Sequence, residues 1–336
     1  MTEGFVVAVV GATGAAGSTL LQILRERRFP VGELRLFASE RSAGTRVEWG
    51  EQQLDVRVVA ERELHGSDVV FFAAGAATSR QFAPRVAASG GLAVGKSSAF
   101  RMEPAVPLVV PEVNADSLRG NAGIVANPNC MTIPLSLTLA PLHRAFGLRH
   151  VTLATYQAAS GAGRALVDEL DLQAATAARG DRPAASVYPH VLHGNVVPGG
   201  WSVVGDEMEE EVKIAAETRR VLGLPQLRIA VTTVRVAVRT GHSAAVWVEC
   251  EEPVDPGAAR VVFRAAPGLT VVDDPAAQQY PTPRDAAGTD AVLVGRIRSD
   301  SSRDNGISFF FASDNLRRGA ATNAVMVAEL ALQLGP

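Results

Sequence analysis

Several features that mark specialised protein classes are scarce in this sequence of 336 residues. Cysteine occurs only twice, as Cys130 and Cys250, without the spacing of zinc ligands or of a disulfide framework. This usage is typical of a reducing compartment, so we expect a cytoplasmic protein that binds no metal. No apolar run approaches the ~20 residues needed to cross a bilayer, and no basic leader precedes the first apolar segment. We therefore expect no membrane association.

An excess of charge of one sign is also missing. The chain has 32 Lys and Arg against 35 Asp and Glu, a formal net charge of -3, which excludes the broad basic surface typical of nucleic-acid binding. An anionic small-molecule substrate would have to be bound by a few local cations. With 47% hydrophobic and 20% charged residues, the chain has the composition of an ordinary globular protein, long enough for two domains.

The amino-terminal segment has the order strand, glycine turn, helix. Phe5–Val10 is a continuous apolar run typical of a strand that is buried on both faces. Residues 11–17 are Gly-Ala-Thr-Gly-Ala-Ala-Gly, and apolar residues at helical spacing follow them. Glycines in such a turn let backbone N–H groups approach a pyrophosphate at the helix N-terminus. We therefore predict a dinucleotide site that includes Gly11, Thr13, Gly14, Ala15 and Ala16.

The loop after the second predicted strand, 34–38, bears on the choice of cofactor. A ribose 2′-hydroxyl is usually bound by an acidic residue at this position, whereas a 2′-phosphate is bound by arginine and hydroxyl groups. Glu40 leaves the preference open, but Ser39, Arg41 and Ser42 together favour NADP.

Buried strands and helices continue to alternate through the first part of the chain. This alternation predicts an α/β fold with a parallel, doubly wound sheet. Further strands are predicted at 56–59, 69–73 and 92–94, and a helix at 80–88. Arg101 then lies on a loop after a strand, where its guanidinium could bind a phosphate or a carboxylate.

Cys130 is the candidate nucleophile. It ends the run Ile-Val-Ala-Asn-Pro-Asn-Cys, and the apolar pattern of Thr132–Phe146 predicts a helix directly after it. The positive end of a helix dipole favours the thiolate, which is the nucleophilic form of cysteine. A lone cysteine is otherwise most often a small buried hydrophobe, so further partners have to support this role.

The second half supplies candidate partners. A strand at 151–156 leads into a second glycine-rich turn that contains Gln157, Ser160 and Gly161, and a helix follows. Residues 179–209 show little periodicity, so we expect a long loop, which could lie at a subunit contact. Further elements are predicted as a helix from Glu210 and Lys213 to about Leu222, strands at 229–238, 243–250, 292–297 and 307–311, and a closing helix at 315–334.

Arg235 on the predicted strand 229–238 and His242, which ends the turn before the strand 243–250, could point toward one pocket. A histidine beside a glycine in a turn is otherwise often only a polar loop residue. Histidine is the side chain best suited to move a proton near neutral pH, which is typically worth ~100- to 10,000-fold in rate.

Ordered motifs along nearly the whole chain resemble the bacterial type of aspartate-semialdehyde dehydrogenase. The motifs are GATGAAG (11–17), ASERSAG (38–44), SSAFR (97–101), VPLVVPEVN (106–114), NPNC (127–130), TYQAASGAG (155–163), GRIR (295–298) and SDNLRRGAA (313–321). The sequence departs from the family pattern at Gly95-Lys96, at Met131, at Ala244-Ala245 and in the loop 186–206.

The resemblance implies a reaction and a role for each matching residue. It implies NADPH-dependent reductive dephosphorylation of an aspartyl 4-phosphate through a cysteine thioester, on the route to lysine, threonine and methionine. The implied roles are nucleophile for Cys130, acid/base for His242, substrate orientation for Gln157, carboxylate binding for Arg235, amino-group binding for Glu210, phosphate binding for Arg101 and Lys213, and cofactor contacts for Ser160, Gly161 and Asn315.

The resemblance also implies an architecture and a homodimer. The expected fold resembles that of glyceraldehyde-3-phosphate dehydrogenase, with an NADP-binding Rossmann domain at 1–129, completed by a helix at about 315–335. An α+β catalytic and dimerisation domain is expected at 130–314. Two alternatives remain at this point: N-acetyl-glutamyl-phosphate reductase, which uses the same thioester chemistry, and a non-catalytic dinucleotide-binding paralogue.

Overall fold

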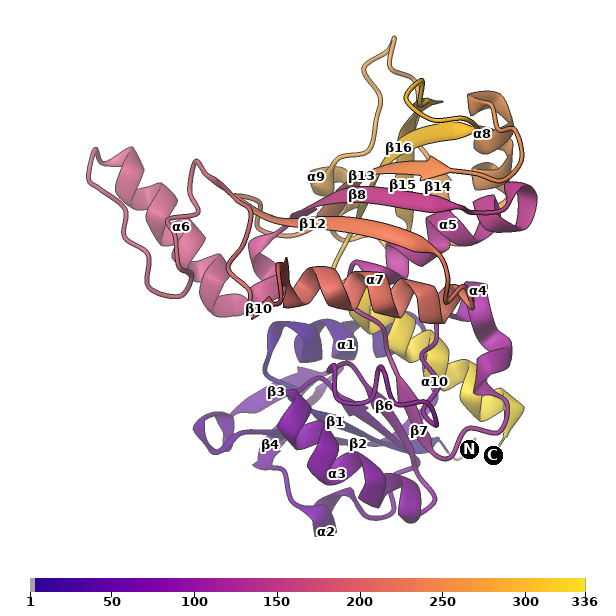
Figure 1. Ribbon diagram of the computed structural model, residues 1–336. Coiled ribbons are helices and arrows are strands. Elements are labelled where there is room, and N and C mark those ends of the chain that lie inside the picture. The colour runs from indigo at the N-terminus through magenta and orange to yellow at the C-terminus, as the bar shows by residue number, and fades with distance from the viewer. Residues whose placement is uncertain (1–3, 336) are drawn as a thin grey trace. The chain divides into compact units, whose positions relative to one another are not determined.

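The computed structural model describes residues 4–335, which divide into two compact units (Figure 1). Unit 1 contains residues 4–129 and 320–335, and unit 2 is Cys130–Gly319. The chain therefore leaves unit 1 directly before the candidate nucleophile and returns to it for its last helix. Each unit is described by itself below.

Unit 1 is built on a seven-stranded sheet of order β3-β4-β2-β1-β5-β6-β7. All neighbouring strands are parallel except the β3–β4 hairpin at one edge. The strands are β1 (Phe5–Val10), β2 (Val31–Ala38), β3 (Arg46–Trp49), β4 (Gln52–Val58), β5 (Val69–Phe72), β6 (Leu92–Gly95) and β7 (Ile124–Ala126). The helices are α1 (Ala15–Glu26), α2 (Glu61–Leu64), α3 (Ala76–Ala88), α4 (Pro111–Asn114) and α10 (Thr322–Leu334), with short 3-10 turns at Glu40–Ser42 and Ala115–Leu118.

Helices cover both faces of this sheet, so the predicted doubly wound fold is confirmed. Leu20 and Leu24 of α1 and Val325 of α10 share one apolar core with one face of the central strands. Phe82 and Val86 of α3 pack in a second core on the other face. Buried strands with helices on both faces are the reason for the unbroken apolar run of β1.

Unit 2 contains a mixed seven-stranded sheet of order β14-β15-β16-β13-β8-β12-β9 and a separate β10–β11 hairpin. The strands are β8 (His150–Gln157), β9 (Val196–Val197), β10 (Val203–Val204), β11 (Glu207–Met208), β12 (Arg228–Val236), β13 (His242–Glu249), β14 (Leu269–Val271), β15 (Val292–Ser299) and β16 (Gly306–Ser313). The helices are α5 (Thr132–Phe146), α6 (Arg164–Ala178), α7 (Glu209–Leu222), α8 (Pro256–Ala265) and α9 (Pro283–Ala286), with a 3-10 turn at Ala159–Ala162. This is the expected α+β arrangement.

Helix α5 has the predicted bounds, but the closing helix was predicted too long. The α-helix begins at Thr322, after a π-helical turn at Arg317–Ala321, so Asn315 lies outside it. The reason is local competition for backbone hydrogen bonds: the Asp314 carboxylate accepts from the N–H groups of Leu316 and Arg317 at 2.8 and 2.9 Å. The sequence pattern alone does not reveal this turn.

Two kinds of feature are missing from the described residues. No helix within residues 4–335 is long and apolar enough to cross a membrane. The same part of the chain holds no group of three or more His, Cys, Asp or Glu side chains placed to bind a metal ion.

Candidate active site

The backbone of Ala158, directly after β8, contacts two of the predicted site residues in unit 2. Its N–H donates to Nδ1 of His242 at 3.0 Å, and its carbonyl accepts from Nη1 of Arg235 at 2.7 Å. His242 is fully buried and Arg235 is 3% exposed. Because Nδ1 accepts a hydrogen bond, the neutral imidazole carries its proton on Nε2. The two residues predicted to point toward one pocket therefore lie together.

Gly161 leaves space for both of these side chains. A Cβ atom at Gly161 would lie 2.8 Å from Nε2 and Cε1 of His242 and 3.0 Å from Nη1 of Arg235. Real Cβ atoms essentially never approach other atoms closer than 3.0 Å. Gly161, for which the family resemblance implies a cofactor contact, thus has a packing role beside the imidazole and the guanidinium.

Helix α7 places Glu210 beside the same sheet. The amide of Gln157 donates to Oε1 of Glu210 at 3.4 Å, and both side chains are buried. Lys213, on the next turn of α7, pairs with Glu209 at 2.5 Å and is partly exposed. The helix is tied to β12 by Glu211, whose carboxylate accepts from the N–H of Thr233 at 2.7 Å.

Asn315 links the two glycine turns of this unit. Its Oδ1 accepts from the hydroxyl of Ser160 and from the N–H of Gly241, both at 3.0 Å. Gly241 precedes His242 in the chain, so this one amide oxygen fixes the turn before the imidazole and the turn after β8. The two predicted cofactor residues Ser160 and Asn315 are in direct contact.

Cys130 lies two residues before the start of α5, at a helix N-terminus as predicted. Cys130 is not disulfide-bonded and is partly exposed, whereas Cys250 is fully buried. Gly319 approaches it closely, because a Cβ at Gly319 would lie 3.0 Å from the carbonyl oxygen of Cys130 and 3.3 Å from its Cβ. The N–H of Gly319 in turn donates to the carbonyl of Asp314, next to Asn315.

Two aromatic residues that the sequence analysis missed contact Arg235. Its guanidinium carbon lies 4.7 Å from the ring centroid of Trp201 and 5.7 Å from that of Tyr188. Both rings come from the segment that was predicted as a loop without further structure. No motif or periodicity in the sequence marks them, because the contact joins residues at least 34 positions apart.

The predicted dinucleotide residues of unit 1 form a tight turn between β1 and α1. Gly11 has φ +91°, and a Cβ at Gly17 would lie 2.1 Å from the carbonyl oxygen of Gly11, so both positions require glycine. Helix α1 begins after Gly14 with no side-chain cap and no acidic residue in its first turn. Its first backbone N–H groups can therefore bind an anion.

A small apolar pocket lies beside this turn. It is lined at the carboxyl ends of β5 and β6 and by the start of α1 and α10, including Ala16, Ala73, Lys96 and Ala321. Ligands bind at this edge of doubly wound sheets.

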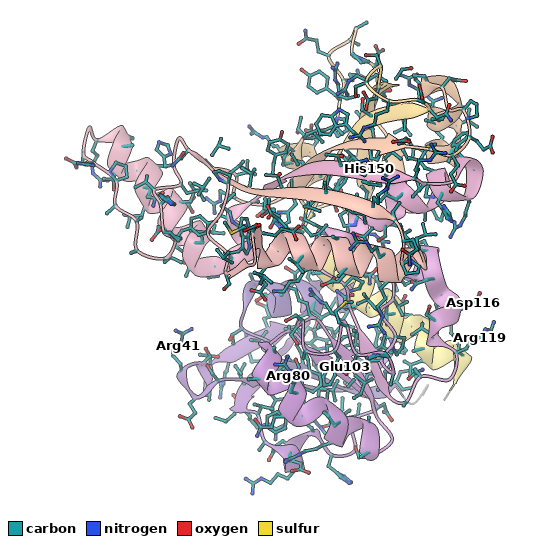
Figure 2. The ribbon with its side chains drawn as sticks, viewed as in Figure 1. Arg41, Arg80, Glu103, Asp116, Arg119 and His150 are labelled. Atoms are coloured by element: carbon teal, nitrogen blue, oxygen red, sulfur yellow. The ribbon has the colours of Figure 1, made fainter. Side chains whose placement is uncertain are left out.

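The remaining predicted residues of unit 1 lie on loops. Ser39 and Arg41 are exposed at the 3-10 turn after β2, and Ser42 is partly exposed. Figure 2 shows Arg41 at the periphery of the unit. Arg101 is 8% exposed, with Nε and Nη2 donating to the carbonyls of Asn127 and Lys96 at 3.0 and 2.5 Å. The 3-10 turn thus presents its groups to solvent, whereas Arg101 is held by backbone carbonyls.

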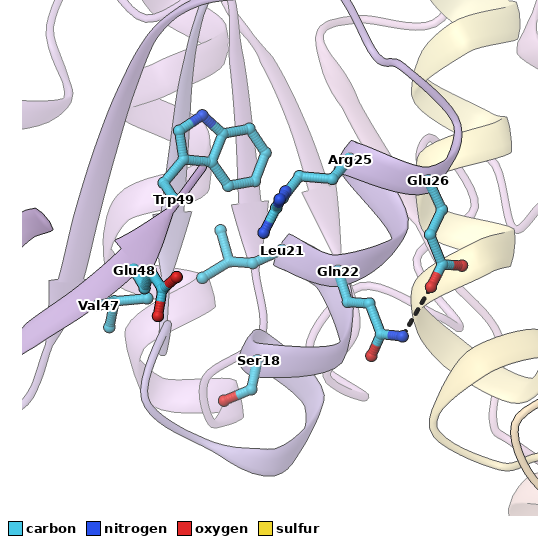
Figure 3. Close-up of a pocket in the computed structure, with 8 residues that line it drawn as sticks. All are labelled: Ser18, Leu21, Gln22, Arg25, Glu26, Val47, Glu48 and Trp49. Carbon is cyan, nitrogen blue, oxygen red and sulfur yellow. Dashed lines mark hydrogen bonds between the residues drawn. The ribbon is translucent and has the colours of Figure 1, made fainter. Parts of the chain in front are cut away.

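A separate hollow in unit 1 contains none of the predicted site residues. It lies between α1 and β3 and is lined by polar and charged side chains together with Trp49 (Figure 3). Arg25 lies over the Trp49 ring at 6.0 Å, and Gln22 donates to Glu26 at 2.6 Å. None of its lining residues is a predicted site residue, and we assign the hollow no role in the site.

Comparison with known proteins identifies the family of the chain. Residues 6–121 match the family model described as semialdehyde dehydrogenase, NAD binding domain, and residues 139–318 match semialdehyde dehydrogenase, dimerisation domain. Aspartate-semialdehyde dehydrogenase of Synechocystis is 41% identical over 98% of both chains, and that of Bacillus subtilis is 39% identical over 98% of both. The crystal structure of aspartate semialdehyde dehydrogenase II from Vibrio cholerae, complexed with ASA, is 37% identical and superposes over 99% of both chains with a TM-score of 0.95.

These findings confirm the function predicted from the sequence motifs and favour it over the two alternatives. They also place a nicotinamide-dinucleotide-binding domain in the first part of the chain and a dimerisation domain in the second. The two family models together cover most of the chain, and the relatives match it over nearly their full length at about 40% identity. The chain therefore belongs to the aspartate-semialdehyde dehydrogenase family.

Proposed function

We propose that this chain is an NADP-dependent aspartate-semialdehyde dehydrogenase. It reduces L-aspartyl 4-phosphate with NADPH to L-aspartate 4-semialdehyde and phosphate, in the biosynthesis of lysine, threonine and methionine. The observation that carries the proposal is the convergence of His242 and Arg235 on the backbone of Ala158, in a chain related to enzymes of this name.

Cys130 is the proposed nucleophile. Its thiolate attacks the acyl carbon of the substrate, the bond from that carbon to the phosphate oxygen breaks, and a thioester forms. Arg101 and Lys213 are the proposed cations for the phosphate that leaves. Partial exposure of Cys130 and its place before α5 support this role.

His242 is proposed to act on the carbonyl oxygen. With its proton on Nε2, the buried imidazole can donate a hydrogen bond to the charge that develops on this oxygen when the carbon becomes tetrahedral. The Ala158 N–H fixes the ring and its tautomer, so no reorientation is needed during the reaction. Bound NADPH would supply the hydride that converts the thioester to the aldehyde level.

Three further residues are proposed to bind the rest of the substrate. Arg235 binds the α-carboxylate through its planar fork, which fixes distance as well as charge. Glu210 binds the amino group, and Gln157 orients the reacting end. The hydrogen bond between Gln157 and Glu210 supports their joint action, and the Vibrio cholerae relative was crystallised with ASA.

The cofactor is proposed to be NADP and not NAD. The residues fit a pyrophosphate, because Gly11 and Gly17 have no room for side chains and the N-terminus of α1 carries no acidic residue. We assign the pyrophosphate to residues 13–16, the 2′-phosphate to Ser39, Arg41 and Ser42, and further contacts to Ser160, Gly161 and Asn315. The exposed hydroxyl and guanidinium groups after β2 support the 2′-phosphate assignment.

A homodimer and a cytoplasmic location complete the proposal. The matched dimerisation domain supports self-association through unit 2. Cys130 and Cys250 are not disulfide-bonded, which is consistent with a reducing compartment.

The direct test is oxidation of aspartate semialdehyde in the presence of phosphate, with NADP and NAD compared at equal concentration. We expect turnover with a preference for NADP. Activity only on the N-acetyl-glutamyl semialdehyde would contradict the substrate assignment, and a preference for NAD would contradict the roles of Ser39, Arg41 and Ser42.

A trapping experiment tests the nucleophile. Mass spectrometry after incubation with substrate should show an acyl adduct on Cys130, and Cys130→Ser should lose turnover while NADPH affinity stays within about twofold. Cys250→Ala is the matched control: Cys250 is fully buried, and burial raises the pKa of its thiol to about 11, so we expect neither an adduct there nor lost turnover. Turnover by Cys130→Ser would remove Cys130 as nucleophile.

A further inference from the structure

The guanidinium of Arg235 is held in an unusual way. It is 3% exposed, yet its only hydrogen bond to a backbone group is the one to Ala158, and Nε has no hydrogen-bond partner in the described residues. Nor does any carboxylate within residues 4–335 form an ion pair with it. A buried cation normally has an anionic partner, because its burial otherwise costs free energy.

Two aromatic rings take the place of such a partner. Trp201 lies 4.7 Å and Tyr188 5.7 Å from the guanidinium carbon, within the distance at which the negative face of a ring attracts a cation. A ring face stabilises the cation without forming the bidentate contact that a carboxylate would form. The guanidinium is thus oriented, and its Nε forms no hydrogen bond within the described residues that a carboxylate would have to displace.

The segment before β12 is built to hold these rings. The hydroxyl of Tyr188 donates to the carbonyl of Gly199. The backbone N–H of Tyr188 donates to the buried carboxylate of Glu169 on α6 at 3.3 Å. Gly200 has φ +90°, and a Cβ there would lie 2.1 Å from the Tyr188 hydroxyl oxygen, so glycine is required next to Trp201. Burial raises the pKa of Tyr188 above its ordinary value, although Arg235 acts in the opposite direction, so the ring stays a neutral phenol.

We propose that Trp201 and Tyr188 are positioning residues that fix the guanidinium of Arg235 for the substrate carboxylate without neutralising it. This inference rests on the proposed role of Arg235 in substrate binding. It gives the segment 184–201 a role, because this segment brings the rings of Tyr188 and Trp201 to the guanidinium of Arg235. Substrate affinity should therefore depend on residues that do not touch the substrate.

Kinetics of Trp201 variants test the proposal. Trp201→Leu should raise KM for aspartate semialdehyde roughly tenfold, the loss expected for a partly desolvated cation–ring contact, while KM for NADP and kcat stay within about twofold. Trp201→Phe keeps a ring face and should recover most of the affinity. Tyr188→Phe, which loses only the hydroxyl, should have a smaller effect than Tyr188→Leu. Trp247→Leu, on β13, is the matched control and should leave all three parameters unchanged.

A double-mutant comparison separates positioning from general destabilisation. In an Arg235→Lys background, Trp201→Leu should add less than about twofold to KM for aspartate semialdehyde, because the fork that it orients is already lost. Multiplication of the two separate effects would overturn the proposal, as would an equal rise in KM for substrate and cofactor.

A spectroscopic readout keeps this test independent of the assigned substrate. In a chain with Trp49→Phe and Trp247→Phe, the fluorescence comes from Trp201 alone, since the sequence has three tryptophans. Arg235→Leu should shift this emission, and an unchanged spectrum would remove the contact. If the wild-type chain were inactive on aspartate semialdehyde but the shift were present, the proposed function would fail while the ring–cation contact stood.

Discussion

At the scale of single residues, the candidate site depends on a backbone group as much as on side chains. The Ala158 backbone contacts the imidazole through its N–H and the guanidinium through its carbonyl. These two groups lie in the two peptide planes that meet at the Cα atom of Ala158, so both side chains are held by one residue at the end of β8. A small displacement of this turn would therefore affect the proposed roles of His242 and Arg235 together.

Gly161→Ala tests this dependence. The added Cβ would lie 2.8 Å from the imidazole of His242 and 3.0 Å from Nη1 of Arg235, so both groups must shift. Misplacement of catalytic groups by about 1 Å can cost about a hundredfold in rate, and we expect a loss of that order in kcat/KM for aspartate semialdehyde. Steady-state kinetics with the purified variant would measure it.

Gly257→Ala serves as the control for this substitution. It lies in the first turn of α8, and its φ is not in the left-handed region. Outside the backbone of the helix itself, a new Cβ would approach the exposed N-cap carboxylate of Asp255 at 3.0 Å, which lies far along the chain from the candidate site residues. Its kcat/KM should stay within about twofold of wild type. Full activity of Gly161→Ala would show that the contact at Gly161 does not set the geometry of the site.

The residues that could be found from the sequence are those in local motifs. Cys130 was predicted to precede a helix because an apolar run, a turn and a helical pattern follow one another within a short stretch, and α5 has the bounds that its pattern predicts. Trp201 and Tyr188 could not be found, since their relation to Arg235 is created by the path of a non-periodic segment. Ala158 could not be found either, because it acts through its backbone N–H and carbonyl, which give no signal in the sequence.

At the scale of elements, α6 organises the segment that follows it. The Glu169 carboxylate on α6 accepts hydrogen bonds from the N–H groups of Ser186 and Val187 at 2.8 and 2.5 Å, and from that of Tyr188. Gln173, one turn later, accepts from the N–H groups of Leu192 and His193 at 2.9 and 3.0 Å. Two buried polar side chains of α6 thus accept hydrogen bonds from the backbone of the non-periodic segment. These bonds take the place of those that regular secondary structure would form.

The charge of Glu169 gives this interaction a pH dependence. Burial alone would raise the pKa of Glu169, but hydrogen bonds from Ser186 and Val187 outweigh it and hold the pKa below the ordinary value of 4.5. A carboxyl group whose pKa is lower in the folded chain stabilises the fold fully above its unfolded pKa, and this contribution is lost as the pH falls through the folded pKa. The stabilisation is therefore complete at neutral pH and declines below about pH 4.5.

We expect Glu169→Gln to lower the free energy of unfolding by about 2 kcal/mol at pH 7, because a charged acceptor of several N–H groups is replaced by an amide. The difference from wild type should shrink as the pH falls below about 4.5, where the wild-type carboxylate also becomes neutral. Urea unfolding at pH 7 and at lower pH measures both. Since Glu169 holds Tyr188, KM for aspartate semialdehyde should also rise.

Asp171→Asn on the same helix is the matched control. Asp171 pairs with Arg239 at 2.8 Å, but both side chains are well exposed, so the loss should stay below about 1 kcal/mol. An equal effect of the two substitutions at pH 7, or a Glu169→Gln effect that does not decrease in acid, would contradict the role of the buried carboxylate.

Element boundaries show where sequence patterns are insufficient. The glycine turn and the buried strands of unit 1 follow from runs of apolar residues, since a strand covered on both faces tolerates few others. The start of the last helix was wrong because Asp314 captures backbone N–H groups and shifts the α-helical pattern to Thr322. The short strands β9 to β11 have two residues each and carry no readable period.

At the scale of the whole molecule, the exposed apolar side chains bear on assembly. Four valines that follow α6 are strongly exposed for their type: Val187, Val196, Val203 and Val204, at 49%, 62%, 66% and 49%. They belong to unit 2, which matches a dimerisation domain. Apolar groups gathered in one segment of the surface are typical of contacts between proteins. This segment is therefore our candidate for the dimer contact.

Substitution of one of these valines by glutamate tests the proposed homodimer. If Val203 is covered by a second copy, Val203→Glu would bury an unpaired carboxylate, which costs more than the lost apolar contact can offset. The mass in solution should then fall from that of two 35.2 kDa chains toward that of one, as measured by light scattering after gel filtration.

Val261→Glu on α8 is the control, because Val261 is 65% exposed but lies outside this segment, and it should leave the dimer intact. A Val203→Glu chain that stays dimeric would place the contact elsewhere, and a wild-type chain that is monomeric at micromolar concentration would remove the homodimer.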